Sequence, residues 1–141
     1  MKRFLVAWII FLSTSFALPA SEIGDDGLHK APWMRDTFKD LQEDLAEANE
    51  EGKRLMVIIE QRGCIYCKKM HDEVFSVERI ANYIGQNFFV VQINMFGDVD
   101  VTDFDGTILQ EKEMVKRWGA LFTPSILFFP QDVAGDVSAV Q

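Results

Sequence analysis

The chain has only two cysteines, Cys64 and Cys67, and their Cys-x-x-Cys spacing suits thiol–disulfide exchange. They stand between an apolar run at residues 55–59 and a stretch with helical spacing, which predicts a strand that leads into a helix through the cysteine turn. At a helix N-terminus, unpaired N–H groups and the helix dipole stabilise a thiolate. We therefore expect Cys64 to be the exposed, attacking thiol and Cys67, one turn later, to resolve the mixed disulfide.

The N-terminus predicts export. Residues 1–20 begin with Lys2 and Arg3, continue with an apolar run at residues 4–16 and end in small residues, which is the pattern of a signal peptide. Cleavage is expected after Ala17 or Ala20, and we favour Ala20. An uncleaved membrane anchor is the alternative, but the run is shorter than the about 18 residues that a spanning helix needs. Export to the periplasm or another oxidising compartment allows a disulfide. A disulfide across two residues gains little chain entropy, which favours a catalytic role for the pair.

The composition indicates one acidic domain. The 141 residues include 14 Lys and Arg against 22 Asp and Glu, for a net charge of −8. Without Lys2 and Arg3 the balance is 12 against 22, or −10, which argues against nucleic acid as a partner. We divide the chain into the signal peptide, a flexible leader at residues 21–31, rich in glycine and aspartate, and one domain at residues 32–141, and we expect a monomer.

Apolar spacing and turn residues predict alternating helices and strands. The expected helices are 36–51, capped by Asp36 and with Phe38 on its apolar face, 64–74, 77–86 and 111–120. The expected strands are 53–60, 88–95, 126–129 and a short final one at 136–140. Buried strands linked by helices form an α/β layer structure.

An acidic segment at residues 96–110 holds four aspartates. A calcium loop is one interpretation, but their spacing does not match the EF-hand pattern. The dipeptide Asp105-Gly106 lies between two short runs, 101–104 and 107–109, which favours a solvated β-hairpin.

Three features resemble the thioredoxin superfamily from about Trp33 onward. They are the strand, Cys64-Ile65-Tyr66-Cys67 turn and helix; the Thr123-Pro124 dipeptide before a strand; and the order of strands and helices. The resemblance implies a thioredoxin-like fold, with a central mixed sheet flanked by helices. It also implies a cis Pro124 beside the dithiol, with Thr123 presenting its backbone to an extended substrate. An ordinary trans proline turn is the alternative.

Within the superfamily, the stretch from Gly63 to His71 resembles periplasmic thioredoxin-like proteins of bacterial sulfur-oxidation systems and the C-terminal thioredoxin-like domain of the transmembrane disulfide reductase. The resemblance implies an exported thiol:disulfide oxidoreductase that reduces disulfide-bearing periplasmic proteins. It implies no cofactor besides the redox-active disulfide Cys64–Cys67. Because no nicotinamide or flavin motif is present, a membrane electron donor is expected to recharge the dithiol.

The sequence departs from thioredoxin at the site. Gly63 replaces a tryptophan, and Ile65-Tyr66 replaces Gly-Pro; we expect these three residues to contact substrate together with Thr123-Pro124. Thioredoxin has a buried aspartate six residues before the first cysteine, where this chain has Ile58.

Two other residues are therefore candidates for tuning the thiol pKa. Glu60 lies four residues before Cys64, and His71 one turn after Cys67, where a surface position is favoured for it. The family fold normally ends in a helix, for which this sequence leaves no room. We thus expect the C-terminal helix to be missing and the sequence to be truncated.

Two other functions stay open. Cys64, Cys67 and His71 have the ligand types of a copper or zinc module or metallochaperone, although a complete site needs more ligands than these three. A non-catalytic binding domain on the same fold is the other alternative. The intact dithiol favours exchange, and on that interpretation no residue is a metal ligand.

Overall fold

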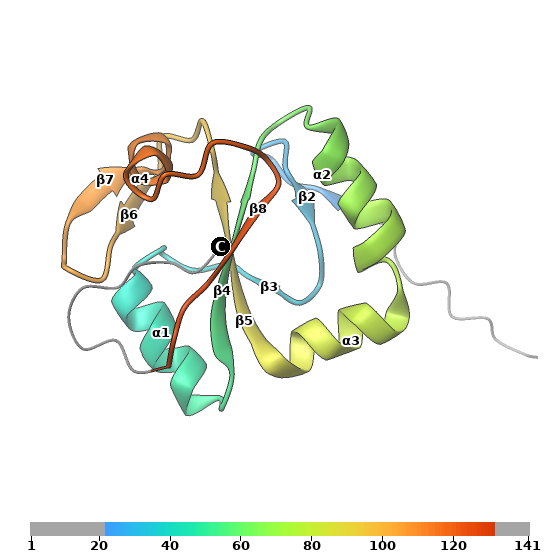
Figure 1. Cartoon of the computed structure of the whole chain (residues 1–141), viewed down its shortest axis with the longest axis horizontal. Helices are drawn as coiled ribbons and strands as arrows, with labels where there is room; N and C mark the ends of the chain where they lie inside the picture. The colour runs from blue at the N-terminus through green and yellow to red at the C-terminus, as the bar shows by residue number, and fades with distance from the viewer. Residues whose placement is uncertain (1–21, 132–141) are drawn as a thin grey trace, which may run out of the picture.

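A four-stranded mixed sheet forms the centre of the computed structural model, which describes residues 22–131 (Figure 1). The strands are, in spatial order, β3 (Met34–Arg35), β5 (Phe88–Asn94), β4 (Arg54–Glu60) and β8 (Ser125–Phe128). Strands β3 and β4 run parallel to β5, whereas β8 is antiparallel to β4. The predicted mixed sheet is therefore confirmed.

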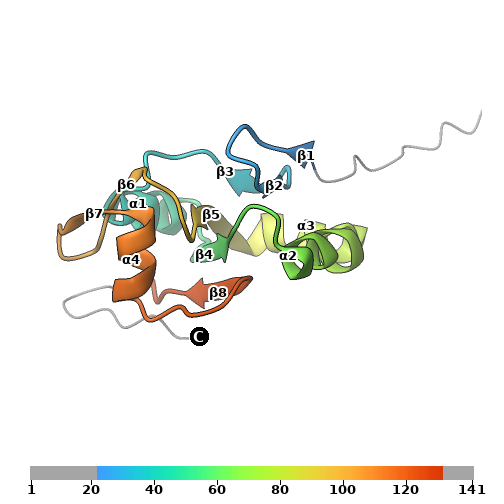
Figure 2. The same ribbon diagram turned by 90° about the horizontal axis from the view of Figure 1, so that it is seen from above.

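Helices cover both faces of this sheet. Figure 2, which looks down on the strands, shows α1 (Leu41–Glu50) and α4 (Glu111–Arg117) on one side. On the other side lie α2 (Ile65–Met70), the π-helical turn η1 (His71–Phe75) and α3 (Glu78–Asn87). The predicted helix 64–74 thus corresponds to α2 and η1, which follow one another without a break.

Strand β4 divides its side chains between two cores. It is buried from Leu55 to Glu60, as a continuous apolar run predicts for a strand covered on both faces. Leu55, Val57 and Ile59 join the apolar core under α1 and α4. Met56 and Ile58 join a smaller core under η1 and α3. Because side chains alternate along a strand, Glu60 belongs to this second face, at the end of the strand next to the cysteines.

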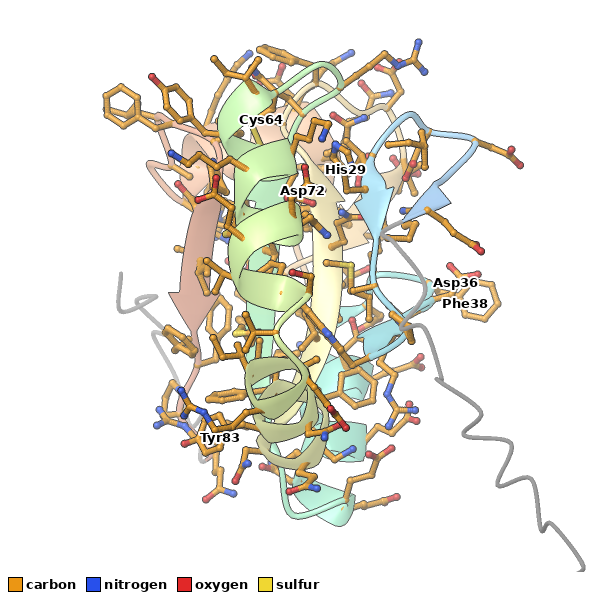
Figure 3. All side chains as sticks on the ribbon, turned by 90° about the vertical axis from the view of Figure 1, so that its right-hand side faces the viewer. His29, Asp36, Phe38, Cys64, Asp72 and Tyr83 are labelled. Atoms are coloured by element: carbon orange, nitrogen blue, oxygen red, sulfur yellow. A yellow bond between two sulfur atoms is a disulfide. The ribbon has the colours of Figure 1, made fainter. Side chains whose placement is uncertain are left out.

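The first helix begins later than predicted. Asp40, not Asp36, is its N-cap, with a carboxylate that accepts hydrogen bonds from the N–H groups of Gln42 and Glu43. Lys39 has a φ of 58°, which keeps the preceding residues out of the helix. Phe38, placed by its spacing on the apolar face, is 95% exposed, and Figure 3 shows it projecting from the molecule.

A hairpin occupies the segment for which we expected a flexible leader. Strands β1 (Glu22–Ile23) and β2 (His29–Lys30) pair antiparallel. Asp26 stabilises the turn by accepting a hydrogen bond from the Leu28 N–H at 3.0 Å. The Leu28 side chain is only 2% exposed and anchors the hairpin on the domain. The expectation of a leader overlooked this single buried leucine.

The acidic segment forms the predicted hairpin, β6 (Asp100–Thr102) and β7 (Ile108–Gln110). Gly106 has a φ of 81°, a conformation that favours glycine. Asp103 is not solvated as expected: it is 7% exposed and pairs with Arg117 at 3.1 Å.

Three predictions lie outside the described residues: the signal peptide, the final strand at 136–140 and the missing C-terminal helix. Between residues 22 and 131, no helix has the length and apolar character needed to cross a bilayer.

Candidate active site

Cys64 and Cys67 form a disulfide at the N-terminus of α2. Cys64 is the N-cap of the helix, in an extended conformation, and its Sγ accepts a hydrogen bond from the Cys67 N–H at 3.0 Å. Cys64 is 7% exposed in this oxidised form, less than expected, but Cys67 beneath it is only 1% exposed. Both cysteines are therefore buried, and Cys64 is the more accessible of the two.

The Thr123-Pro124 segment lies against Cys64. The peptide bond between these two residues is cis, and the segment leads directly into β8. The Thr123 hydroxyl donates to Cys64 Sγ at 3.4 Å, and the Thr123 carbonyl oxygen lies 3.7 Å from the same sulfur. The backbone and the hydroxyl of Thr123 therefore both lie beside the sulfur of Cys64.

Exposed apolar side chains belong to the two segments that meet at the disulfide. From the cysteine turn come Ile65, 72% exposed, and Tyr66, 67% exposed. Leu121 and Phe122, both 77% exposed, precede Thr123 and were not among the residues singled out from the sequence. Two consecutive apolar residues directly before a Thr-Pro dipeptide were the signal that could have identified them. Exposed apolar groups in such number are typical of a surface that binds protein.

Gly63 supplies the turn into the helix. Its φ of 71° lies in the left-handed region that favours glycine, and an added Cβ would meet nothing within 4 Å. A larger residue is therefore opposed by the backbone conformation alone.

Glu60 and His71 come together below the helix. His71 Nε2 lies 3.1 Å and 3.3 Å from the two carboxylate oxygens of Glu60. Glu60 is 1% exposed and His71 is 2% exposed, so the surface position favoured for His71 is wrong. His71 lies on the apolar face of the helix, which packs on the sheet. Its charged sequence neighbours Lys68, Lys69 and Asp72 suggested an exposed position instead.

Gln92 of β5 extends the pair to the N-terminal hairpin. Its side-chain amide donates to Glu60 and, at 2.8 Å, to the His29 carbonyl. Its carbonyl oxygen accepts from Lys30 Nζ at 2.6 Å. A single amide within the buried apolar run at residues 89–93 was the sequence signal for Gln92, and sequence reasoning missed it.

His29 covers the pair from the hairpin side. Its ring centroid lies 5.2 Å from that of His71, and Figure 3 shows it between the hairpin and the helix that carries Cys64 and Asp72. Burial lowers the pKa of His29, and the neighbouring His71 lowers it further. His29 is thus held neutral near pH 7.

The structure does not supply a complete set of ligands for the alternative copper or zinc site, within the residues that it describes. Across the part of the chain that the structure describes, no group of three His, Cys, Asp or Glu side chains is placed to hold a metal ion. In addition, Nε2 of His71 is occupied by Glu60.

Comparison with known proteins identifies the family and the fold. The sequence profile of the thioredoxin-like domain family matches residues 41–135. A thiol:disulfide interchange protein, DsbD of Colwellia psychrerythraea, is 29% identical over 89 residues, which are 63% of this chain and 13% of that protein. The chain therefore spans about an eighth of that relative's length. The solution structure of a thioredoxin from Thermus thermophilus superposes with a TM-score of 0.50 at 24% identity, over 72% of this chain and 69% of that one.

Proposed function

Because the chain belongs to the thioredoxin-like domain family, we propose that it reduces disulfide bonds of partner proteins in the periplasm through a Cys64–Cys67 dithiol. The family and the paired cysteines make it a thioredoxin-like protein of the disulfide oxidoreductase type. The observation that carries the finer proposal is the position of Cys64 Sγ, at a helix N-terminus and within 3.4 Å of the Thr123 hydroxyl. The name of the Colwellia relative, an interchange protein, supports it.

The proposed cycle has two exchange steps. The Cys64 thiolate attacks one sulfur of the partner disulfide, the partner's S–S bond breaks, and the released partner thiolate takes up a proton. Cys67 then loses its proton and attacks Cys64 Sγ. The mixed disulfide breaks, the second partner sulfur leaves as a thiolate, and Cys64–Cys67 is oxidised while the partner is reduced. The exposed apolar groups Ile65, Tyr66 and Phe122 contact the partner around its disulfide.

Export and recharging complete the proposal. Residues 1–20 have the composition of a secretory signal peptide, so the mature protein begins at Ser21. A membrane protein that carries a dithiol returns the two electrons and two protons to Cys64–Cys67. N-terminal sequencing of the protein recovered from the periplasmic fraction tests the cleavage site, and recovery of uncleaved chain in the membrane fraction supports an anchor instead.

The deciding experiment measures the reduction potential of the Cys64–Cys67 couple in defined thiol buffers. A reductase is expected near the value of thioredoxin, about −270 mV, whereas a disulfide donor lies near about −120 mV. A value close to the second would reverse the proposed direction. Cys67→Ser serves as the control, because it cannot form the internal disulfide. If the wild type forms no reversible disulfide but binds copper or zinc tightly, the metal-binding alternative replaces the redox function.

A further inference from the structure

The Glu60–His71 pair lies beneath the helix that carries the dithiol, and the exchange cycle above gives it no role. Glu60 ends β4 on the sheet face covered by α2. The His71 N–H donates to the Cys67 carbonyl, so these two residues are one helical turn apart. Residues four apart share a helix face, and helical side chains lean toward the N-terminus. The His71 ring therefore leans over the turn that holds Cys67, and both side chains are buried.

The hydrogen bonds fix which nitrogen of His71 carries the proton. The Glu60 carboxylate accepts from the Gln92 amide and lies 3.1 Å from His71 Nε2. A carboxylate has no hydrogen to give, so Nε2 must be the donor in this contact. In the neutral ring Nδ1 then keeps a lone pair. It is buried and has no hydrogen-bond partner in the disulfide form. A buried polar atom without a partner is costly, so a hydrogen-bond donor that reaches Nδ1 in the reduced form would stabilise that form.

We infer that His71 Nδ1 accepts the proton of Cys67 when this thiol resolves the mixed disulfide, and that Glu60 positions the ring and balances the imidazolium charge. The inference deepens the proposed function and rests on it. The Cys67 S–H bond breaks toward Nδ1, the electron pair left on Sγ attacks Cys64 Sγ, and the partner sulfur leaves with the electrons of the mixed disulfide. On reduction by a donor dithiol, the Cys67 thiolate that is released takes the proton back from Nδ1.

The surroundings leave His71 as the group that exchanges this proton. The charged and titratable side chains around the pair come from the hairpin, α2 and η1: Asp26, His29, Lys30, Lys68 and Asp72. Lys30 is neutralised by Asp26 at 2.7 Å, and Lys68 pairs with Asp72. Burial holds His29 in its neutral form, with His71 adding to the effect.

The test distinguishes the reactions of the two thiols, because they occur one after the other. Reduced protein is mixed with one equivalent of 5,5′-dithiobis(2-nitrobenzoate) in a stopped-flow instrument. Attack by Cys64 releases the first thionitrobenzoate, and resolution by Cys67 releases the second. We expect His71→Gln to slow the second release about 10²-fold at pH 7 and to leave the first within about twofold, in line with the loss of one general base. Glu73→Gln, which changes an exposed carboxylate of the same helix that pairs with Lys69, is the matched control and should change neither release.

The pH profile supplies a readout that altered folding does not reproduce. In the wild type, the rate of the second release should level off once the imidazole is neutral. In His71→Gln it should keep rising by about tenfold per pH unit, because the Cys67 thiolate then forms only as hydroxide removes the proton. Glu60→Gln keeps the shape of the site without the charge and should slow the second release less than His71→Gln does. This variant remains informative if the histidine variant does not fold.

Three results would overturn the inference: an unchanged second release in both variants, equal slowing of both releases, or a wild-type profile that rises without levelling. Failure of the proposed function is distinguishable from these. In that case the wild type itself releases no second equivalent.

Discussion

The two faces of the central sheet each bury a glutamate near the C-terminal ends of the parallel strands, but with different partners. On the α4 side, Glu111 is 2% exposed, pairs with Lys39 and accepts from the Asn94 N–H at 3.0 Å. On the α2 side, Glu60 is 1% exposed and pairs with His71. An ammonium keeps its charge throughout the physiological pH range, whereas an imidazole gains and loses a proton near neutrality. We therefore treat Glu111–Lys39 as a fixed structural pair and assign the proposed proton exchange to the second pair alone.

The largest effect on stability is expected from breaking the fixed pair. Glu111→Gln leaves the mostly buried Lys39 without a counter-charge, and the free energy of unfolding should fall by about 3 kcal/mol. Urea denaturation measures this loss. The exposed Glu113→Gln, which breaks only the contact with Lys116, is the control and should cost at most about 0.5 kcal/mol. The comparison between the faces fails if Glu111→Gln, measured where the protein is folded, slows the second thionitrobenzoate release as much as His71→Gln.

Asp44 gives a third case for the comparison, because its buried carboxylate is hydrogen-bonded to a hydroxyl and not paired with a cation in the described part of the chain. Asp44 of α1 is 3% exposed and accepts a hydrogen bond from the Thr37 hydroxyl at 3.2 Å. Burial raises the pKa of Asp44 to about 6 from 3.8, with help from Asp40 and Glu47. The folded state then holds this proton more tightly than the unfolded chain does, so stability is lost as the pH rises from about 4 through 6.

Asp44→Asn should remove that loss. We expect the variant to be more stable than the wild type by about 1–2 kcal/mol at pH 7.5 and to show no such gain at pH 4. Thermal unfolding at a series of pH values measures the difference. Asp36→Asn alters an exposed carboxylate of the same region and should leave the pH dependence as it is. If the stability of the Asp44 variant and that of the wild type changed in parallel with pH, this account of the α1 face would be contradicted.

The smallest effect is expected at the surface of the α1 side. Asp40→Ala removes the N-cap of α1 and should lower the free energy of unfolding by about 1 kcal/mol, while Asp40→Asn restores most of it. Because the cap lies on the face away from the dithiol, neither variant should change the rate of thiol exchange. A change in that rate, at equal folded fraction, would show that the two faces are coupled.

The fold was predictable because its signals are local. Each local pattern predicts one element and its buried side. Two apolar runs predict β4 and β5, and the helical spacing around Met114 and Val115 predicts α4. Cys64, Cys67 and Thr123-Pro124 were recognisable from motif and spacing, and the structure brings them together. The start of α1 was missed because two aspartates four residues apart are both suitable caps, and only the backbone of Lys39 distinguishes them.

The polar network below the helix was less predictable because its contacts are long-range. Glu60 and His71 are 11 residues apart, and Gln92 is 32 residues from Glu60. Both Glu60 and His71 were named from the sequence, but their partnership was not. The exposed neighbours Asp72 and Glu73 conceal the burial of His71, although Cys67 and Phe75, four residues away on either side, are buried. Only the packing of α2 and η1 on the sheet decides that the ring points inward.

The hairpin at residues 22–30 lies before the residues that the family profile matches. A protein trimmed to residues 41–135 would retain the dithiol and Thr123, yet it would lack Leu28, the His29 carbonyl and Lys30. Water would then reach Gln92 and the carboxylate behind it. Recombinant versions cut at residue 41 would thus lose the cover over the Glu60–His71 pair, to which we assign the proton exchange.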